Sequence, residues 1–182
     1  NWAIINGEES MGYSVHYLDE GIDTGDIIAQ DSVSILPEDD IMSLTYKLAS
    51  KAPQMLIKVL NDIQAGNICR VPQDEDYASY YPPRKPVDGL INWSMDDMSI
   101  HNLVRSLTRP YPGAFTFIKG IKLQVWRTRI GLDVIEGYDF GMLMEADAGS
   151  LLVSTGNNPI LITDYDLSRE INIEQFIGEP FE

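Results

Sequence analysis

The first half of the chain contains two strand-like runs followed by one long helical pattern. The runs Gly12–Leu18 and Asp26–Val33 predict strands, and residues 19–25 between them hold two glycines and three acids, which is typical of a tight polar loop. From residue 41 to about residue 66 the apolar residues keep helical spacing, which predicts an amphipathic helix whose apolar stripe packs in the core. Pro53 lies inside this pattern, so it should kink the helix or divide it in two.

The second half changes from a helical pattern to a period of two. Residues 94–108 predict a helix, which Pro110 and Pro112 end. The strands predicted after it are Ala114–Ile118, Ile121–Arg129, Gly141–Glu145, Leu151–Ser154 and Ile160–Asp164. Lys119 and Gly120 form the turn of a hairpin between the first two. Five short strands separated by turns favour a small barrel, and an OB-like barrel is the commonest solution at this size.

Residues 73–86 differ in composition from both halves. They contain three consecutive acids, three tyrosines and three prolines, so the stretch should be extended rather than helical and is the best candidate for a linker. The tyrosines could recognise a base or a sugar, but packing against a domain surface is favoured because tyrosine is often half-buried. The sequence thus predicts a first domain over residues 1–70, a linker over 71–86 and a second domain over 87–182.

The charge of the chain disfavours one class of partner. The 182 residues include 13 Lys and Arg against 28 Asp and Glu, for a formal net charge of -15. The acidity is general, since residues 1–70 carry 4 basic and 11 acidic side chains and residues 71–182 carry 9 and 17. A protein that binds polyanions normally presents a Lys and Arg surface. Nucleic acid is therefore disfavoured as a partner, and the acidity is interpreted as a solubility feature.

Cys69 is the single cysteine, which excludes an intramolecular disulfide and a cysteine-based zinc site. We therefore expect a reducing, cytoplasmic compartment and no bound metal, with Cys69 as a small buried residue. No apolar run reaches the roughly 18–20 residues that a membrane helix needs. The sequence thus predicts a soluble protein without a membrane partner.

The densest group of chemically useful residues lies between His16 and Asp26. A carboxylate held in a loop between two strands, beside other acids, can act as a proton acceptor. An Asp-rich loop with glycines is also typical of a plain turn. This pattern taken alone leaves both interpretations open.

Two separate motifs carry a resemblance to a known family. The run from Gly12 to Ile28 resembles the signature of formyltransferases that use 10-formyltetrahydrofolate, and three later stretches resemble the start of that family's C-terminal domain. Those stretches are Arg84–Trp93, Ile100–Arg105 and Arg109–Phe115. The resemblance covers nearly the whole chain in order.

The resemblance implies an α/β fold, namely the C-terminal portion of a Rossmann-like catalytic domain followed by an OB-like β-barrel domain. It identifies Asp23, in an Asp-Thr-Gly triplet, as the catalytic residue. It also implies that Leu18, Asp19, Glu20 and Asp23 border the folate co-substrate, largely through backbone groups. His16 lies where several family members carry His, and it either helps to set the charge around Asp23 or is a structural strand residue.

The family's active site also uses an Asn and a His from an upstream strand, and neither lies within residues 1–182. The first residues, Asn1–Gly7, have the pattern of the last turns of a helix that stops at Gly7. We therefore expect the chain to be the C-terminal part of a formyltransferase and to be inactive alone.

Three hypotheses for function follow from these observations. The first is formyl transfer to the amine of a nucleotide-linked amino sugar, the second is formyl transfer to methionyl-tRNA, and the third is a binding module without catalysis. The first is favoured over the second because a tRNA-binding barrel should carry a basic face and residues 71–182 are acidic. The intact Asp23 loop argues against the third.

Overall fold

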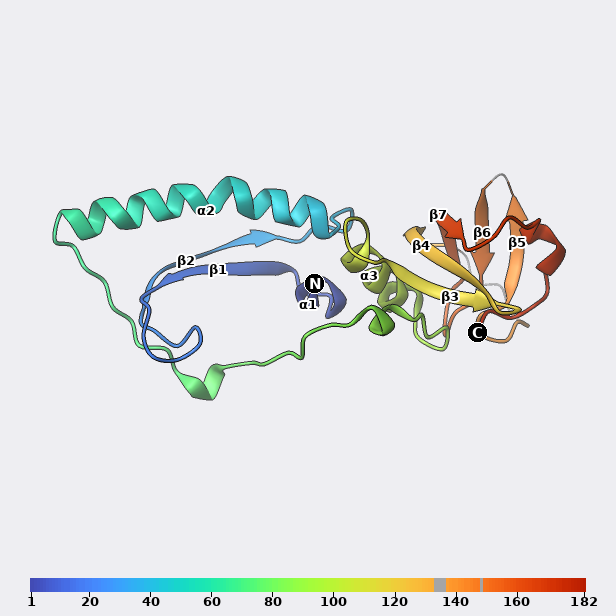
Figure 1. The fold of residues 1–182 in the computed structure, drawn as a ribbon, viewed down its shortest axis with the longest axis horizontal. Coiled ribbons are helices and arrows are strands. Elements are labelled where there is room, and N and C mark those ends of the chain that lie inside the picture. Colours follow the sequence, from blue (N-terminus) through green and yellow to red (C-terminus); the bar gives the residue numbers. More distant parts are fainter. Residues whose placement is uncertain (133–136, 148) are drawn as a thin grey trace. The chain divides into compact units, whose positions relative to one another are not determined.

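The computed structural model describes residues 1–132, 137–147 and 149–182, which form helices, 3₁₀ turns and two antiparallel sheets (Figure 1). The helices are α1 (Trp2–Ile5), α2 (Ile41–Gln64) and α3 (Asp97–Leu107). The strands are β1 (Ser10–His16), β2 (Ile27–Ser34), β3 (Ala114–Ile118), β4 (Ile121–Arg129), β5 (Leu143–Asp147), β6 (Ser150–Val153) and β7 (Ile160–Leu167). The 3₁₀ turns are η1 (Glu75–Tyr77), η2 (Pro86–Gly89) and η3 (Ile173–Phe176).

The chain divides into two compact units. We call residues 8–39 and 43–82 the hairpin unit, because they contain the β1–β2 pair. We call residues 1–7, 40–42 and 83–182 the sheet unit, because they contain the five-stranded sheet. The domain boundaries predicted at residues 70 and 86 stay a prediction.

In the hairpin unit, β1 and β2 pair in antiparallel register with one irregularity close to the connecting loop. Val15 lies opposite Ala29, whereas His16 lies opposite Ile27, so Ile28 is an extra residue on β2. Such a bulge increases the local twist and changes the direction of the neighbouring side chains. The bulge lies at the base of the loop that carries the predicted site.

Helix α2 runs alongside the hairpin in Figure 1 without interruption from Ile41 to Gln64. The predicted division at Pro53 is wrong. Ala49 and Pro53 are both exposed, so water can satisfy the carbonyl that the proline leaves without an N–H donor. The prediction that the apolar stripe packs in the core is also wrong in part: Leu44 and Val59 are buried, but Leu56 is 46% exposed. A two-stranded hairpin covers only part of one helix face.

A buried carboxylate lies just before α2. Asp39 is only 4% exposed, and its side chain accepts hydrogen bonds from Leu36 N at 2.7 Å and Ser43 Oγ at 2.8 Å. It also forms an ion pair with Lys47. Burial would raise the pKa of Asp39, but the hydrogen bonds from Lys47, Leu36 N and Ser43 outweigh it and hold the pKa below its ordinary value. The charged form of Asp39 therefore stabilises the start of α2.

The core of the sheet unit lies between α3 and the sheet. Four apolar residues of α3, spaced along one helix face, are buried: Ile100, Leu103, Val104 and Leu107. Burying each such side chain contributes about 1.5–3 kcal/mol. The Asp96 side chain caps the helix by accepting from Ser99 N at 2.7 Å. Inside the core, Trp93 Nε1 donates to Thr116 Oγ1 at 3.0 Å, so the buried indole N–H is satisfied.

The sheet has the order β3-β4-β7-β6-β5, which leaves β3 and β5 as its edges. The chain's last residues hydrogen-bond to the β3 edge and to the segment that leads into β5: Glu182 N donates to Phe117 O at 2.8 Å, and Phe181 N donates to Gly141 O at 2.8 Å. Among the described residues no closed barrel is seen, so the predicted OB-like barrel is not confirmed. The two edge strands bond to this terminal segment rather than to each other.

The segment that was predicted to be an extended linker contains a short 3₁₀ turn. The Asp74 side chain caps η1 by accepting from Asp76 N at 3.1 Å. The predicted packing of the tyrosines is wrong for two of them, since Tyr77 is 87% and Tyr80 is 81% exposed. The composition of the stretch indicated its irregular backbone but not which surface its side chains face.

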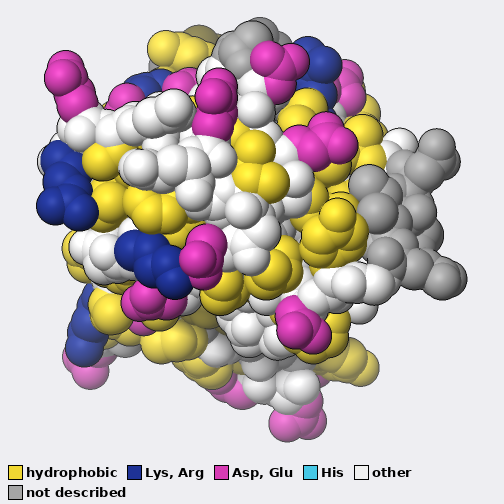
Figure 2. Space-filling model, turned by 90° about the vertical axis from the view of Figure 1, so that its right-hand side faces the viewer, with side chains coloured by type: hydrophobic (Ala, Val, Ile, Leu, Met, Phe, Trp, Pro, Cys, Tyr) yellow, Lys and Arg dark blue, Asp and Glu magenta, His cyan; other side chains and the backbone are white. Residues whose placement is uncertain are grey.

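Two cations of the sheet unit form ion pairs with acids. Arg109 contacts Asp164 at 3.0 Å and Asp166 at 3.4 Å, and Lys119 contacts Glu179 at 2.7 Å. On the face shown in Figure 2, Lys and Arg side chains lie apart from one another among hydrophobic and acidic side chains. This face therefore carries no continuous basic patch. Separately, none of the helices in the described part of the chain combines the length and apolar character of a membrane span.

Candidate functional site

The loop of residues 17–26 joins β1 to β2 and is closed at its base by Tyr17 N, which donates to Asp26 O at 2.9 Å. Within the loop, the Asp19 carboxylate accepts from Thr24 Oγ1 at 2.7 Å and from Gly21 N at 2.9 Å. These bonds, first that from Thr24 and then that from Gly21, hold the pKa of Asp19 below its ordinary value. The predicted site residue Asp19 thus organises the loop as a charged acceptor.

Asp23 is the exposed carboxylate of this loop. Its backbone has φ of 59°, in the left-handed region that residues with a Cβ rarely occupy, and its side chain is 87% exposed. Asp23 Oδ1 lies 3.6 Å from Nε2 of His16 at the end of β1. His16 Nδ1 lies 2.8 Å from Tyr17 O, and because a carbonyl can only accept, Nδ1 carries the proton of that bond. The structure therefore brings together two of the predicted residues, Asp23 and His16.

The other predicted residues of the loop face solvent. Leu18 is 93% exposed, Glu20 is exposed, and the neighbouring Ile22 is 91% exposed. Two exposed apolar side chains on one short loop gain free energy when an apolar partner covers them. The loop and the end of β1 thus offer a carboxylate, an imidazole and two apolar side chains within ten residues.

Sequence reasoning missed two residues that contact the loop from the segment after α2. The Arg70 guanidinium lies 3.9 Å from the Tyr17 ring centroid and 3.5 Å from Asp26 Oδ2. The Gln73 side chain donates from Nε2 to Asp23 O at 2.7 Å and to Gly25 O at 2.8 Å. No local sequence pattern predicts these contacts, because Arg70 and Gln73 lie about 50 residues from the loop in the sequence.

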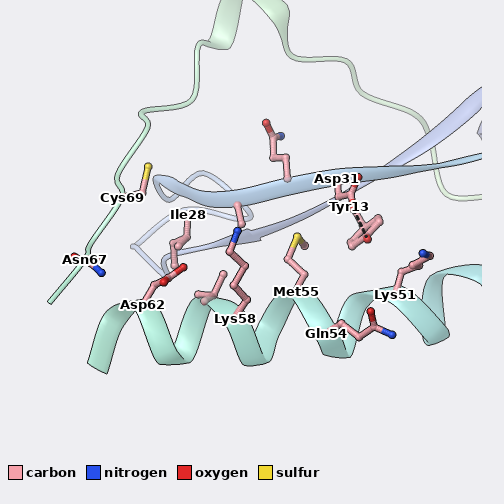
Figure 3. Close-up of a pocket in the computed structure, with 13 residues that line it drawn as sticks. Tyr13, Ile28, Asp31, Lys51, Gln54, Met55, Lys58, Asp62, Asn67 and Cys69 are labelled. Atoms are coloured by element: carbon pink, nitrogen blue, oxygen red, sulfur yellow. Dashed lines mark hydrogen bonds between the residues drawn. The ribbon is translucent and has the colours of Figure 1, made fainter. Parts of the chain in front are cut away.

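A cavity of about 400 Å³ lies between α2 and β2, apart from the predicted site residues (Figure 3). Lys51 and Lys58 line it from α2, and Tyr13 donates to Asp31 Oδ2 at 3.1 Å on the strand side. Cys69 also lines this cavity and is exposed, so the prediction of a buried cysteine is wrong. Cys69 lies in the extended chain that follows α2, where no second layer covers it.

Metal chemistry has no evident site in the part of the chain that the structure describes. No group of three or more His, Cys, Asp and Glu side chains there is arranged to hold a metal ion. The candidate site consists of the Asp23 carboxylate in the loop and the His16 imidazole at the end of β1.

Comparison with known families identifies the family of the chain. A family model described as "Formyl transferase" matches residues 1–60, which include the loop, and one described as "Formyl transferase, C-terminal domain" matches residues 84–179. The second match alone covers more than half of the chain. The chain belongs to the formyl transferase family.

Named relatives of this formyl transferase chain include two methionyl-tRNA formyltransferases. Those of Desulforamulus reducens and Acetivibrio thermocellus are each 35% identical over 179 residues, which is 97% of this chain. The alignments cover 56% and 57% of those proteins, so the chain spans about half the length of the curated relatives it matches.

A solved structure with the same fold is the N-formyltransferase from Helicobacter canadensis, in complex with folinic acid and dTDP-3-aminofucose. It matches with a TM-score of 0.70 and 22% identity, over 90% of this chain and 59% of that one. At this identity the likeness shows the formyltransferase fold.

Proposed function

We propose that the protein transfers a formyl group from 10-formyltetrahydrofolate to a primary amine, with Asp23 as the acid/base residue. The observation that carries this proposal is the exposed Asp23 carboxylate beside His16, on a loop with an ordered backbone, in a chain of the formyl transferase family. The chain spans about half the length of the curated relatives it matches. The activity is therefore proposed for the full-length protein.

The chemistry requires one proton to change place. The co-substrate supplies the formyl group as an amide on its N10 atom. As the amine nitrogen bonds to the formyl carbon and the bond from that carbon to N10 breaks, the amine must lose a proton and N10 must gain one. Asp23 can accept the first proton and return it to N10, and a placed acid/base of this kind contributes roughly 10²–10⁴-fold. His16 Nε2 lies 3.6 Å from Asp23 Oδ1, beside the carboxylate that would carry this proton.

The loop also supports the proposed folate contact. Leu18 and Ile22 expose apolar side chains that can cover a flat heterocycle, and the loop backbone presents N–H and C=O groups between them. Asp19 and Glu20 lie in the same stretch, and the Asp19 carboxylate is already occupied by Thr24 and Gly21. We therefore propose that Leu18, Asp19, Glu20 and Asp23 border the folate mainly through their backbone, with no metal involved.

We propose a nucleotide-linked amino sugar as the acceptor. The charge of the second half supports this choice, because residues 71–182 carry 9 basic against 17 acidic side chains and two of the cations, Arg109 and Lys119, are engaged by carboxylates. An acidic surface of this kind disfavours binding of a phosphate backbone. The single cysteine supports a cytoplasmic location for the reaction.

Methionyl-tRNA is the second candidate acceptor. The observation that favours it is the 35% identity, over 97% of the chain, to proteins named methionyl-tRNA formyltransferases. A tRNA acceptor would require basic residues outside the paired set described above.

The test is formylation by the full-length protein that contains residues 1–182. It is incubated with 10-formyltetrahydrofolate and with UDP- and dTDP-linked amino sugars or methionyl-tRNA, and mass spectrometry detects the gain of a formyl group on each amine. Formylation of at least one acceptor, abolished by Asp23→Asn, is the expected result. Absence of formyl transfer to every amine, with a correctly folded protein, would contradict the proposal.

A further inference from the structure

The amide of Gln73 is placed to hold the loop that carries Asp23. Its Nε2 atom donates to Asp23 O at 2.7 Å and to Gly25 O at 2.8 Å, so one NH₂ group binds the carbonyls on both sides of Thr24. Both distances are within the range of good N–H···O bonds. A two-point contact of this kind fixes the orientation of the intervening peptides as well as their position.

The position of Gln73 is itself fixed by backbone pairing. Val71 and Ile27 exchange two hydrogen bonds, from Ile27 N to Val71 O at 2.8 Å and from Val71 N to Ile27 O at 3.0 Å. This bridge anchors the chain beside the start of β2, two residues before Gln73. Arg70, which contacts Tyr17 and Asp26, adds a second anchor at the base of the loop. Gln73 therefore reaches the loop from an ordered support.

Asp23 needs such support because its own backbone conformation is unfavourable. A φ of 59° lies in the left-handed region, which residues with a Cβ rarely occupy. The Asp23 side chain is 87% exposed, and within the described part of the chain its one ion-pair contact is with His16, at 3.6 Å. Gly25, two residues after Asp23, cannot be replaced by a residue with a side chain without a shift of the backbone, because a Cβ there would lie 1.8 Å from Tyr17 O. The direction of the carboxylate is thus set by the backbone rather than by packing.

We propose that Gln73 is a positioning residue for formyl transfer, holding the backbone of Asp23 so that its carboxylate stays beside His16. This proposal rests on the function proposed above for Asp23. Gln73 does not touch the reacting atoms in this scheme; it acts through the two carbonyls. Small displacements of a reacting group can lower a rate by up to about 10²-fold, so the contact has a measurable consequence.

The test compares Gln73→Glu with Gln30→Glu in the full-length protein. Gln73→Glu keeps the shape of the side chain but replaces the NH₂ donor by an oxygen that faces two carbonyls. Gln30 is an exposed residue on β2 whose amide donates to Ser14 Oγ at 3.0 Å, so Gln30→Glu makes the same charge change away from the loop. We expect Gln73→Glu to lower kcat about 10- to 100-fold with a smaller change in KM for the amine, and Gln30→Glu to leave both unchanged.

Hydrogen exchange provides a readout that does not depend on activity. In Gln73→Glu, exchange should rise over residues 17–26 and stay unchanged in α2, with the same urea unfolding midpoint as the wild type. Wild-type kcat in Gln73→Glu would overturn the proposal, and so would a fall in kcat matched by a general loss of protection and stability. If the wild-type protein formylates no amine, the proposed function is contradicted. Independently of that result, unchanged hydrogen exchange over residues 17–26 in Gln73→Glu would overturn the positioning role of Gln73.

Discussion

His16 Nε2 lies 3.6 Å from Asp23 Oδ1, although the two residues belong to different parts of the hairpin. The bulge at Ile28 shifts the register at His16, and the positive φ of Asp23 turns its side chain back toward the end of β1. His16 donates through Nδ1 to Tyr17 O, so Nε2 faces the carboxylate. In the function proposed above, this pair would supply the acid/base chemistry on which the first prediction depends.

Replacing Asp23 by Asn in the full-length protein should lower kcat for formyl transfer by at least about 10²-fold. The amide has nearly the same shape but cannot accept a proton, and a placed acid/base contributes roughly 10²–10⁴-fold. Steady-state kinetics with 10-formyltetrahydrofolate measure the effect, and urea unfolding should show unchanged stability. Asp31→Asn, on the same hairpin, is the matched control and should keep wild-type turnover. Near-wild-type turnover in Asp23→Asn would leave Asp23 as a turn residue only.

Residues 1–182 alone are expected to show no formyl transfer. The chain spans 56–57% of its curated relatives, and the Asn and His that the family resemblance implies lie outside it. A preorganised donor to the developing oxyanion contributes about 3–4 kcal/mol, which the Asp23 loop alone does not supply. The assay is the mass-spectrometric one used for the full-length protein, run at high concentration of the fragment. Turnover by residues 1–182 with any amine would refute this prediction.

Asp39→Asn should destabilise the protein by about 1–3 kcal/mol at pH 7, because it removes a buried charged acceptor from Lys47, Leu36 N and Ser43. Burial opposes the charged form, but those hydrogen bonds keep the folded-state pKa below the ordinary value of 3.8. A carboxylate with a depressed folded pKa contributes stability above its unfolded pKa and loses it as pH falls through the folded value. The difference in free energy of unfolding between wild type and Asp39→Asn should therefore shrink below about pH 4.

Urea unfolding at several pH values measures this difference. Glu38→Gln is the control, since Glu38 precedes Asp39 but is exposed. If the difference in free energy of unfolding between wild type and Asp39→Asn grew on acidification, the predicted direction of the pH dependence would be wrong.

The full-length protein should bind tRNA only in the non-specific range of about 10⁻⁴–10⁻⁶ M at physiological salt while it formylates an amino sugar nucleotide. Residues 71–182 carry 9 basic against 17 acidic side chains, and two of these cations are engaged by carboxylates, Arg109 by Asp164 and Asp166 and Lys119 by Glu179. Titration of tRNA binding against salt should accordingly give a shallow slope. Efficient formylation of methionyl-tRNA, with a steep salt slope and no sugar turnover, would reverse the order of the two acceptors.

The local pattern of the chain was sufficient for elements whose hydrogen bonds close within a few residues. The bounds of β3 and β4 match the prediction, because two strand-like runs flank Lys119 and Gly120, both of which take positive φ in the turn. The loop that carries Asp23 and His16 was also predicted, since glycines and acids between two strand-like runs permit little else. The family followed from motifs that are contiguous in sequence.

Contacts between distant positions, and the covering of surfaces, were decided by the tertiary structure. Gln73 reaches Asp23 across 50 residues, and Asp39 is buried against Lys47, yet neither polar residue differs in sequence from an exposed one. Leu56 and Cys69 show the opposite difference: the sequence predicts that both are buried, but both are exposed in the structure. Periodicity specifies which face of an element is apolar. It does not specify which segment packs against that face, because this depends on the path of the chain between distant elements. The free energy of burial or pairing is gained only where a partner surface is present.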